Sequence, residues 1–283
     1  MKNTCFLKFF FSLICILISG MLTPTLCFSQ EVKLGSSLIC GIPLTKSDAT
    51  RRKSTFAQEV KNALLIANSN YLGNIPSLAE SVKEARYLKL ALESIGFSVT
   101  IVENANREMM EDALFNFKEK CETEGGIAFL HYGGHAVQID GMLYLIPVSA
   151  NITNATQARF KCVNIQDLME CMQGDANIAI FDSARNNPFP SEKNRRADRS
   201  SNAPNFVQPS NSIILYSTES GTATKDGIFT PILTGYITEK NKSASEIFKI
   251  VCLEVSKKTG GRQNPCLYDH LLSHIYFANP NKE

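Results

Sequence analysis

The sequence lacks a strong charge of either sign, and it contains neither an internal repeat nor a low-complexity tract. Its 283 residues include 29 Lys and Arg and 27 Asp and Glu, so the formal net charge is only +2. Basic residues occur only in short clusters such as Arg51-Arg52-Lys53. Nucleic-acid-binding proteins usually carry a concentrated basic stripe, so this balance excludes a nucleic-acid or other polyanionic partner. The hydrophobic content of 44% supports a sizeable core.

The amino terminus has an apolar run that is too short to cross a bilayer comfortably. Fourteen residues, Phe9 to Leu22, form this run, and Lys2 and Lys8 flank its start. This arrangement is typical of a signal peptide, which we predict over residues 1–29, with cleavage near Ser29. We therefore expect an exported protein, secreted or periplasmic after cleavage, that meets the membrane only transiently. The alternative is an uncleaved membrane anchor, which the length of the run disfavours.

Of the nine cysteines, three lie in the predicted signal peptide. An even number remains, which permits disulfides in an exported protein, although the sequence does not give their pairing. Buried free thiols are an equally good interpretation, because several of these cysteines fall on apolar helix faces. The six remaining cysteines are Cys40, Cys121, Cys162, Cys171, Cys252 and Cys266.

Residues 30–58 are polar and aperiodic, which predicts a linker before a domain over residues 59–279. In that domain strands alternate with helices, beginning with a continuous apolar run, Ala63 to Ala67, typical of a strand buried on both faces. This alternation predicts an α/β fold with a mostly parallel sheet covered on both sides, and in such sheets the functional site lies at the carboxyl ends of the strands. Further strands are expected over residues 98–102, 126–132, 178–181 and 212–216, with helices over 108–121 and 165–172.

Two more helix starts are predicted from capping boxes, in which a serine and a glutamate three residues later satisfy the free backbone amides. The first is Ser77 to Glu80, and the second is Ser243 to Glu246. Each precedes an amphipathic stretch, and Gly96 ends the first helix.

Small and polar residues follow two of the predicted strands. The first segment is His131-Tyr132-Gly133-Gly134-His135-Ala136, and the second is Asp182-Ser183-Ala184-Arg185-Asn186-Asn187-Pro188-Phe189. A histidine beside glycines is weak evidence by itself, since a structural role explains it equally well. Together, however, the segments lie at the carboxyl ends of two strands, where a parallel sheet binds its ligands.

The two segments resemble the histidine block and the nucleophile block of caspase-like cysteine peptidases, of the metacaspase and paracaspase type that includes bacterial caspase-family proteins. The resemblance covers about residues 61–278 in the family's order. It implies a caspase-like three-layer α/β/α sandwich with a mostly parallel central sheet of about six strands. It also implies a large-subunit part over about 59–190, an exposed loop over about 188–209, and a small-subunit part over about 210–279.

Carried over residue by residue, the resemblance makes His135 the general acid and base. Ala184 occupies the position of the nucleophilic cysteine, and the backbone amides of Ala136 and Ala184 would face the oxyanion. Glu84 and Asp182 match the carboxylates that select an arginine or lysine side chain in metacaspases and paracaspases. A solvated charge on a helix face is an equally good interpretation of Glu84.

Two residues depart from the family's pattern. Ala184 replaces the cysteine, and a methyl group cannot attack a carbonyl; Ala136 replaces a glycine whose backbone approaches the substrate. Either the chain is a natural pseudo-protease or its cysteine was replaced to trap an inactive form, and Ala136 slightly favours natural loss.

The expected function is that of a cysteine-type endopeptidase for protein substrates with a basic residue at the cleavage site, inactive as written. The first alternative is a non-catalytic pseudo-protease that binds peptides or regulates a relative. The second is an unrelated α/β hydrolase that uses Ser183, but the Gly-x-Ser-x-Gly turn is missing.

No cofactor or metal is expected. Asp269, His270 and His274 have a spacing that could hold a metal on one helix face. Apolar residues interrupt them, so a terminal core segment is the preferred interpretation.

Overall fold

The computed structural model describes residues 60–73, 75–185, 207–222 and 227–278, which all belong to a compact unit from Thr55 to Glu283. The predicted signal peptide, the predicted linker over 30–58 and most of the predicted loop over 188–209 lie outside the described residues.

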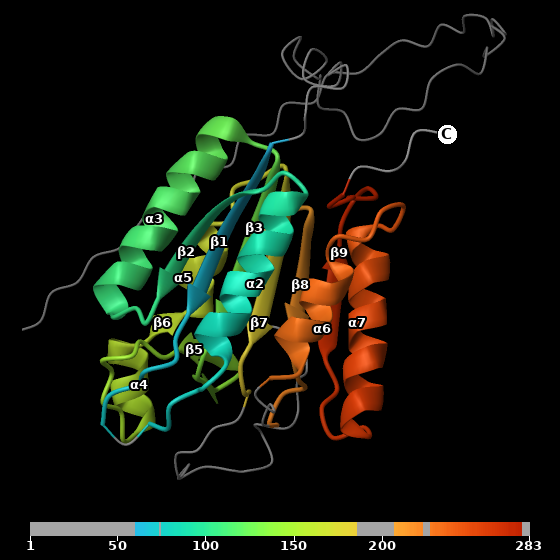
Figure 1. Ribbon diagram of the computed structural model, residues 1–283. Coiled ribbons are helices and arrows are strands. Elements are labelled where there is room, and N and C mark those ends of the chain that lie inside the picture. Colours follow the sequence, from blue (N-terminus) through green and yellow to red (C-terminus); the bar gives the residue numbers. More distant parts are fainter. Residues whose placement is uncertain (1–59, 74, 186–206, 223–226, 279–283) are drawn as a thin grey trace, which may run out of the picture. The chain divides into compact units, whose positions relative to one another are not determined.

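The central sheet has six strands in the order β2-β1-β3-β7-β8-β9 (Figure 1). All neighbouring pairs are parallel except β8 and β9, which are antiparallel. The prediction of a mostly parallel sheet of about six strands is therefore confirmed. The bounds are β1 Lys61–Ala67, β2 Ser98–Glu103, β3 Ile127–Gly133, β7 Ala176–Asp182, β8 Ser212–Tyr216 and β9 Cys266–His270.

Helices cover both faces of this sheet, which makes a three-layer α/β/α sandwich (Figure 1). Successive side chains of a strand point to opposite faces, so Leu65 packs toward α2, α6 and α7, whereas Leu64 packs toward α3 and α5. This explains the continuous apolar run in β1, since both faces are buried. The helices on the first face are α2 Ser81–Ser94, α6 Phe229–Tyr236 and α7 Ala244–Thr259, and those on the second are α3 Arg107–Glu124 and α5 Ile165–Glu170.

The two predicted capping boxes have different outcomes. At α7 the box forms as expected: the Ser243 side chain accepts from the Glu246 amide, and the Glu246 side chain accepts from the Ser243 amide. At α2 the prediction was wrong, because the helix begins at Ser81 and Glu80 makes no side-chain cap. The hydroxyl oxygen of Ser69, which follows β1, accepts from the amide of Val82 at 3.2 Å instead. The loop that enters the helix therefore supplies the cap.

A small second sheet, which was not predicted, follows β3 in the order β4-β5-β6. Its strands β4 and β5 form an antiparallel hairpin that begins directly after His135. The bounds are β4 Ala136–Ile139, β5 Met142–Leu145 and β6 Val163–Asn164, with α4 Ala155–Lys161 before β6.

The segment with Asp269, His270 and His274 is not a helix. Asp269 and His270 belong to the edge strand β9, and His274 lies in the irregular chain that follows. The helical spacing considered for a metal does not apply, because successive side chains of a strand point to opposite sides. No group of three or more His, Cys, Asp or Glu side chains suitable for a metal occurs within the described part of the chain.

The five cysteines that the structure describes are free thiols, and Cys40 lies outside the described residues. Burial raises the pKa of Cys121, Cys162 and Cys252 to about 12 in each case, so they remain protonated and unreactive. None of the helices in the described ranges is both long enough and apolar enough to span a membrane.

Candidate active site

The two polar segments that follow β3 and β7 lie side by side at the carboxyl edge of the sheet. β3 and β7 are neighbouring parallel strands, with Gly133 in register with Asp182. Just beyond this pair, the amide of Gly134 donates to the carbonyl oxygen of Asp182 at 3.2 Å. His135 is one residue from this hydrogen bond and Ala184 is two residues from it, so the tertiary structure brings both expected catalytic positions to one place.

The imidazole of His135 is half-buried and is held by residues of the loop that follows β1. Its ring lies 4.7 Å from the ring of Tyr71, centroid to centroid. Its Nε2 atom is 2.7 Å from the carbonyl oxygen of Pro76. A carbonyl oxygen can only accept, so Nε2 carries a proton and donates it to Pro76. This hydrogen bond and the Tyr71 ring hold the imidazole in one orientation.

The backbone around His135 is equally fixed. Its amide donates to the phenol oxygen of Tyr71 at 2.7 Å, and its carbonyl accepts from the phenol of Tyr132 at 2.7 Å. A Cβ atom at Gly134 would lie 2.6 Å from the Tyr71 phenol oxygen and 2.7 Å from that of Tyr132. Only glycine fits between these two phenols, which explains the residue that precedes the histidine.

Ala136 places its amide outside the β4–β5 ladder. The Ile146 amide donates to the His135 carbonyl at 3.0 Å, which makes His135 and Ile146 a hydrogen-bonded pair. Such pairs alternate with non-hydrogen-bonded ones in an antiparallel ladder. The next pair, Ala136 with Leu145, is therefore of the second kind, and the Ala136 amide points away from β5. The Ala136 amide therefore takes no part in the pairing of β4 with β5.

Ala184 is half-buried, and the backbone after it is anchored. The amide of Arg185 donates to the carbonyl of Thr222 at 2.9 Å, and the Arg185 guanidinium stacks 4.0 Å from the ring of Tyr216. The neighbouring Ser183 is only 1% exposed. A hydroxyl buried to this degree cannot reach a substrate, which argues against Ser183 as a replacement nucleophile.

The two carboxylates expected to bind a basic side chain lie on the same face of the sheet. Glu84 is on the first turn of α2 and is only 7% exposed, so it is not a solvated surface charge. A Cβ atom at Gly227, just before α6, would lie 3.7 Å from its Oε1 atom. Asp182 accepts from the Thr230 hydroxyl of α6 at 2.7 Å. Because α2 and α6 pack against each other, both carboxylates lie around the start of α6.

Ser81 connects the first turn of α2 to the end of β3. A Cβ atom at Gly133 would lie 2.9 Å from the Ser81 hydroxyl oxygen, so the serine sits directly against that glycine. The hydroxyl is buried and has no hydrogen-bond partner among the described residues. It lies one helical turn before Glu84, which places it on the same side of α2.

Several residues of the site were missed from the sequence. Tyr71 and the Pro76 carbonyl belong to a loop with no recognisable motif, and a backbone carbonyl leaves no trace in a sequence. His131 was taken as part of a strand, yet it faces Thr230, with 3.1 Å between its Nε2 and the threonine Oγ1. The two-residue alternation of a strand could have indicated the direction of the His131 side chain, since His131 and Phe129 share the face toward α2. Burial lowers the pKa of His131 to about 4.

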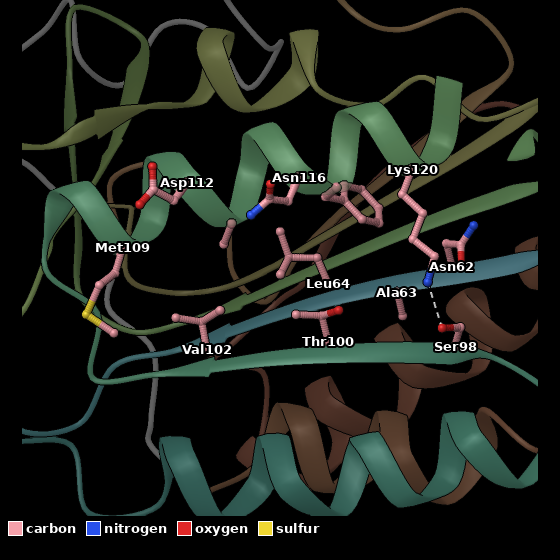
Figure 2. A pocket seen from close by; sticks show the side chains of 12 residues that line it. Asn62, Ala63, Leu64, Ser98, Thr100, Val102, Met109, Asp112, Asn116 and Lys120 are labelled. Atoms are coloured by element: carbon pink, nitrogen blue, oxygen red, sulfur yellow. Dashed lines mark hydrogen bonds between the residues drawn. The ribbon is translucent and has the colours of Figure 1, made fainter. Parts of the chain in front are cut away.

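A groove of about 390 Å³ lies elsewhere, between the edge of the sheet at β1 and β2 and the helix α3 (Figure 2). None of the candidate site residues at the carboxyl ends of β3 and β7 lines it, and its lining contains no histidine or cysteine. Lys120 crosses one end of the groove and donates to the Ser98 hydroxyl at 2.7 Å. This groove is separate from the site at the carboxyl ends of the strands.

A family model described as "Caspase domain" matches residues 60–276, which is most of the chain. The chain belongs to the caspase-domain family. Its fold is similar to that in the crystal structure of caspase-1 from Spodoptera frugiperda, with a TM-score of 0.59 and 13% sequence identity. The match covers 80% of this chain and 92% of that chain. No curated protein matches the chain.

The caspase-domain match spans both polar segments, the first strand and the final strand. The caspase-like peptidase fold expected from the sequence is therefore confirmed. At 13% identity the structural likeness concerns the fold alone, and the roles of the individual site residues rest on the geometry described above.

Proposed function

We propose that this caspase-domain chain is of the metacaspase and paracaspase type and binds peptides through an arginine or lysine side chain, without cleaving them as written. Glu84 and Asp182 would receive the cation, because charge-assisted hydrogen bonds to a guanidinium or ammonium are among the stronger polar contacts. The observation that carries the proposal is the placement of two carboxylates around the start of α6: Glu84 is buried against Gly227, and Asp182 accepts from Thr230.

The reaction that the site would support needs a cysteine in place of Ala184. Its thiolate would attack the peptide carbonyl carbon, and the amides of residues 136 and 184 would stabilise the oxyanion. The C–N bond would then break, and the imidazolium of His135 would protonate the departing amine. Water would hydrolyse the thioester, with His135 as the base. In this chain the first step has no nucleophile.

Ala184 also supports a second function. A chain that keeps the fold and the binding side chains but lacks the nucleophile can hold a peptide without releasing products. Such a chain would act as a regulatory module, either by sequestering substrates or by binding an active relative. Both functions need the same basic-residue pocket.

The test is isothermal titration calorimetry with four versions of one peptide amide, which end in Arg, Lys, Asp or Leu. We expect the Arg and Lys peptides to bind with micromolar to millimolar affinity, because small ligands must offset their lost rigid-body freedom. Asp182→Asn should weaken this preference. Glu93→Gln is a matched control, since Glu93 lies at the exposed far end of α2 and pairs with Lys89. Equal binding of all four peptides would disprove the basic-residue pocket and leave the fold assignment unchanged.

A further inference from the structure

Two buried side chains and one half-buried side chain, from three different elements, form a continuous hydrogen-bonded chain beside the proposed pocket. His131 of β3 lies with Nε2 3.1 Å from Oγ1 of Thr230 on α6. The same threonine oxygen is 2.7 Å from Oδ2 of Asp182 at the end of β7. His131 and Thr230 are each only 1% exposed. Water therefore does not compete for the hydrogen bond between His131 and Thr230.

The chemistry of the three groups gives the chain one direction. The Thr230 hydroxyl donates its single proton to Oδ2 of Asp182. The threonine oxygen must then accept from His131, which requires the proton of the imidazole to be on Nε2. Burial lowers the pKa of His131 to about 4, so the ring is neutral near pH 7 and carries one proton. Its Nδ1 atom is buried and has no hydrogen-bond partner in the part of the chain that the structure describes.

A neutral imidazole with an unpartnered buried nitrogen has a cost, because desolvated polar atoms normally find partners. The other nitrogen of the ring, Nε2, donates to the Thr230 hydroxyl oxygen, and the Thr230 hydroxyl in turn donates to Asp182. The arrangement therefore serves the orientation of that carboxylate. A carboxylate held by a fixed donor loses less freedom when a cation binds, and a preorganised site binds more tightly.

We propose that Thr230 and His131 are positioning residues that hold Oδ2 of Asp182 and so orient this carboxylate toward the cationic side chain of a bound peptide. Thr230 acts on Asp182 directly, and His131 acts through Thr230 by fixing the direction of its hydroxyl. This inference rests on the proposed function, since the cation is the ligand of that same pocket. Charge selectivity would then depend on Thr230 and His131 as well, although neither carries a charge at neutral pH.

The first experiment compares an arginyl peptide amide with the same peptide containing citrulline, which is a neutral isostere of arginine. The ratio of the two dissociation constants, measured by calorimetry at pH 7 on the full chain, reports charge selectivity alone. Thr230→Val should lower this ratio about 3- to 10-fold, the effect of one hydrogen bond of ordinary net strength. Thr230→Ser keeps the hydroxyl and should retain most of the ratio.

Thr234→Val is the matched control on the same helix. Its hydroxyl donates to the Thr230 carbonyl at 2.8 Å and has no role in orienting Asp182. We expect this variant to keep the wild-type ratio. The proposal is overturned if Thr230→Val also keeps that ratio while Asp182→Asn lowers it. Circular dichroism melts of each variant confirm that the fold is retained.

The second experiment does not depend on peptide binding. The chain has four histidines, so selective ¹⁵N-histidine labelling gives few signals, and a His131→Gln variant assigns those of His131. We expect nitrogen shifts of a neutral ring with the proton on Nε2 at pH 7. Thr230→Val should shift the Nε2 signal, because it removes the acceptor. A proton on Nδ1 would contradict the hydrogen-bond chain, because Nε2 would then take the Thr230 proton from Asp182.

The two experiments separate the two proposals. If the wild-type chain binds arginyl and citrulline peptides equally, the basic-residue pocket is wrong and the proposed orientation toward a cation falls with it. The NMR result then still decides whether the hydrogen-bond chain exists. If the wild-type chain discriminates but Nδ1 carries the proton, the pocket stands and the positioning role of His131 is wrong.

Discussion

Nε2 of His135 lies 2.7 Å from the carbonyl oxygen of Pro76, and this contact fixes the tautomer of the histidine. Pro76 belongs to the loop between β1 and α2, so the orientation of the His135 ring depends on a segment far from β3 in the sequence.

The purified chain should not cleave arginyl or lysyl peptide reporters. Loss of the nucleophile in a peptidase reduces turnover on the order of a million-fold, so fluorogenic reporters should show no signal above background. Ser183→Ala should change nothing, because the Ser183 side chain is buried. Activity that persists through purification and disappears in Ser183→Ala would show that Ser183 is the nucleophile.

Ala184→Cys should restore cleavage after Arg or Lys, because it supplies a thiol at the position next to His135. The measurement is kcat/KM on the same reporters, with Ala184→Ser as a matched variant of similar size. If Ala184→Cys is inert and the double variant with Ala136→Gly is active, the residue after the histidine also limits the site. If both variants are inert, the binding-module function is favoured and the inactivated-peptidase interpretation is wrong.

His131 should make the stability of the fold depend on pH in the acidic range. Its pKa is lowered by burial to about 4 in the folded chain, against about 6.5 for an exposed histidine. Between these values the unfolded state binds more protons, so the free energy of unfolding decreases as the pH falls from about 6.5 to 4. The loss amounts to about 3 kcal/mol in total.

Urea unfolding at several pH values measures this dependence. In His131→Gln the contribution of this group should vanish, which makes the curve flatter between pH 6.5 and 4. His274→Gln is the control, since His274 is exposed. An unchanged slope in His131→Gln would show that His131 is not the group responsible.

Gly134→Ala should destabilise the fold by about 1–3 kcal/mol, the usual cost of forcing an extra methyl group into a packed site. The added Cβ would lie 2.6 Å from the Tyr71 phenol oxygen and 2.7 Å from that of Tyr132. Thermal unfolding gives the loss, and combining the change with Tyr71→Phe should recover part of it. Gly235→Ala on α6 is the matched control, because nothing lies within 4 Å of its added Cβ. Equal melting temperatures for the two alanine variants would contradict the clash.

The core strands were predictable because both of their faces are buried, so their sequences are apolar without a break. The predicted strand over 212–216 matches β8, and β1 includes the whole predicted run. The hairpin β4–β5 was not predictable in the same way, since its four-residue strands are too short to show a period. The start of α2 was misplaced because the side chain that caps it, Ser69, lies twelve residues before the helix, and only the path of the loop brings it to the Val82 amide.

The residues of the candidate site also fall into a predictable group and an unpredictable one. The histidine, the alanine at the cysteine position and the two carboxylates were all predicted, because a motif or a charge marks each of them. Their supports were not predicted. The Pro76 carbonyl is a backbone atom, and Thr230 is one of many threonines on a helix; each gains its role only from a partner distant in the sequence.

The sequence by itself determined the class of fold, because the apolar period of each element is a local property of the chain. Only the tertiary structure decided that Glu84 is buried rather than solvated, which nitrogen of His135 carries the proton, and that His131 is linked through Thr230 to Asp182. The physical reason is that burial and hydrogen bonding depend on neighbours in space, and the register of the parallel strands, together with the packing of α2 and α6 on their face, sets those neighbours.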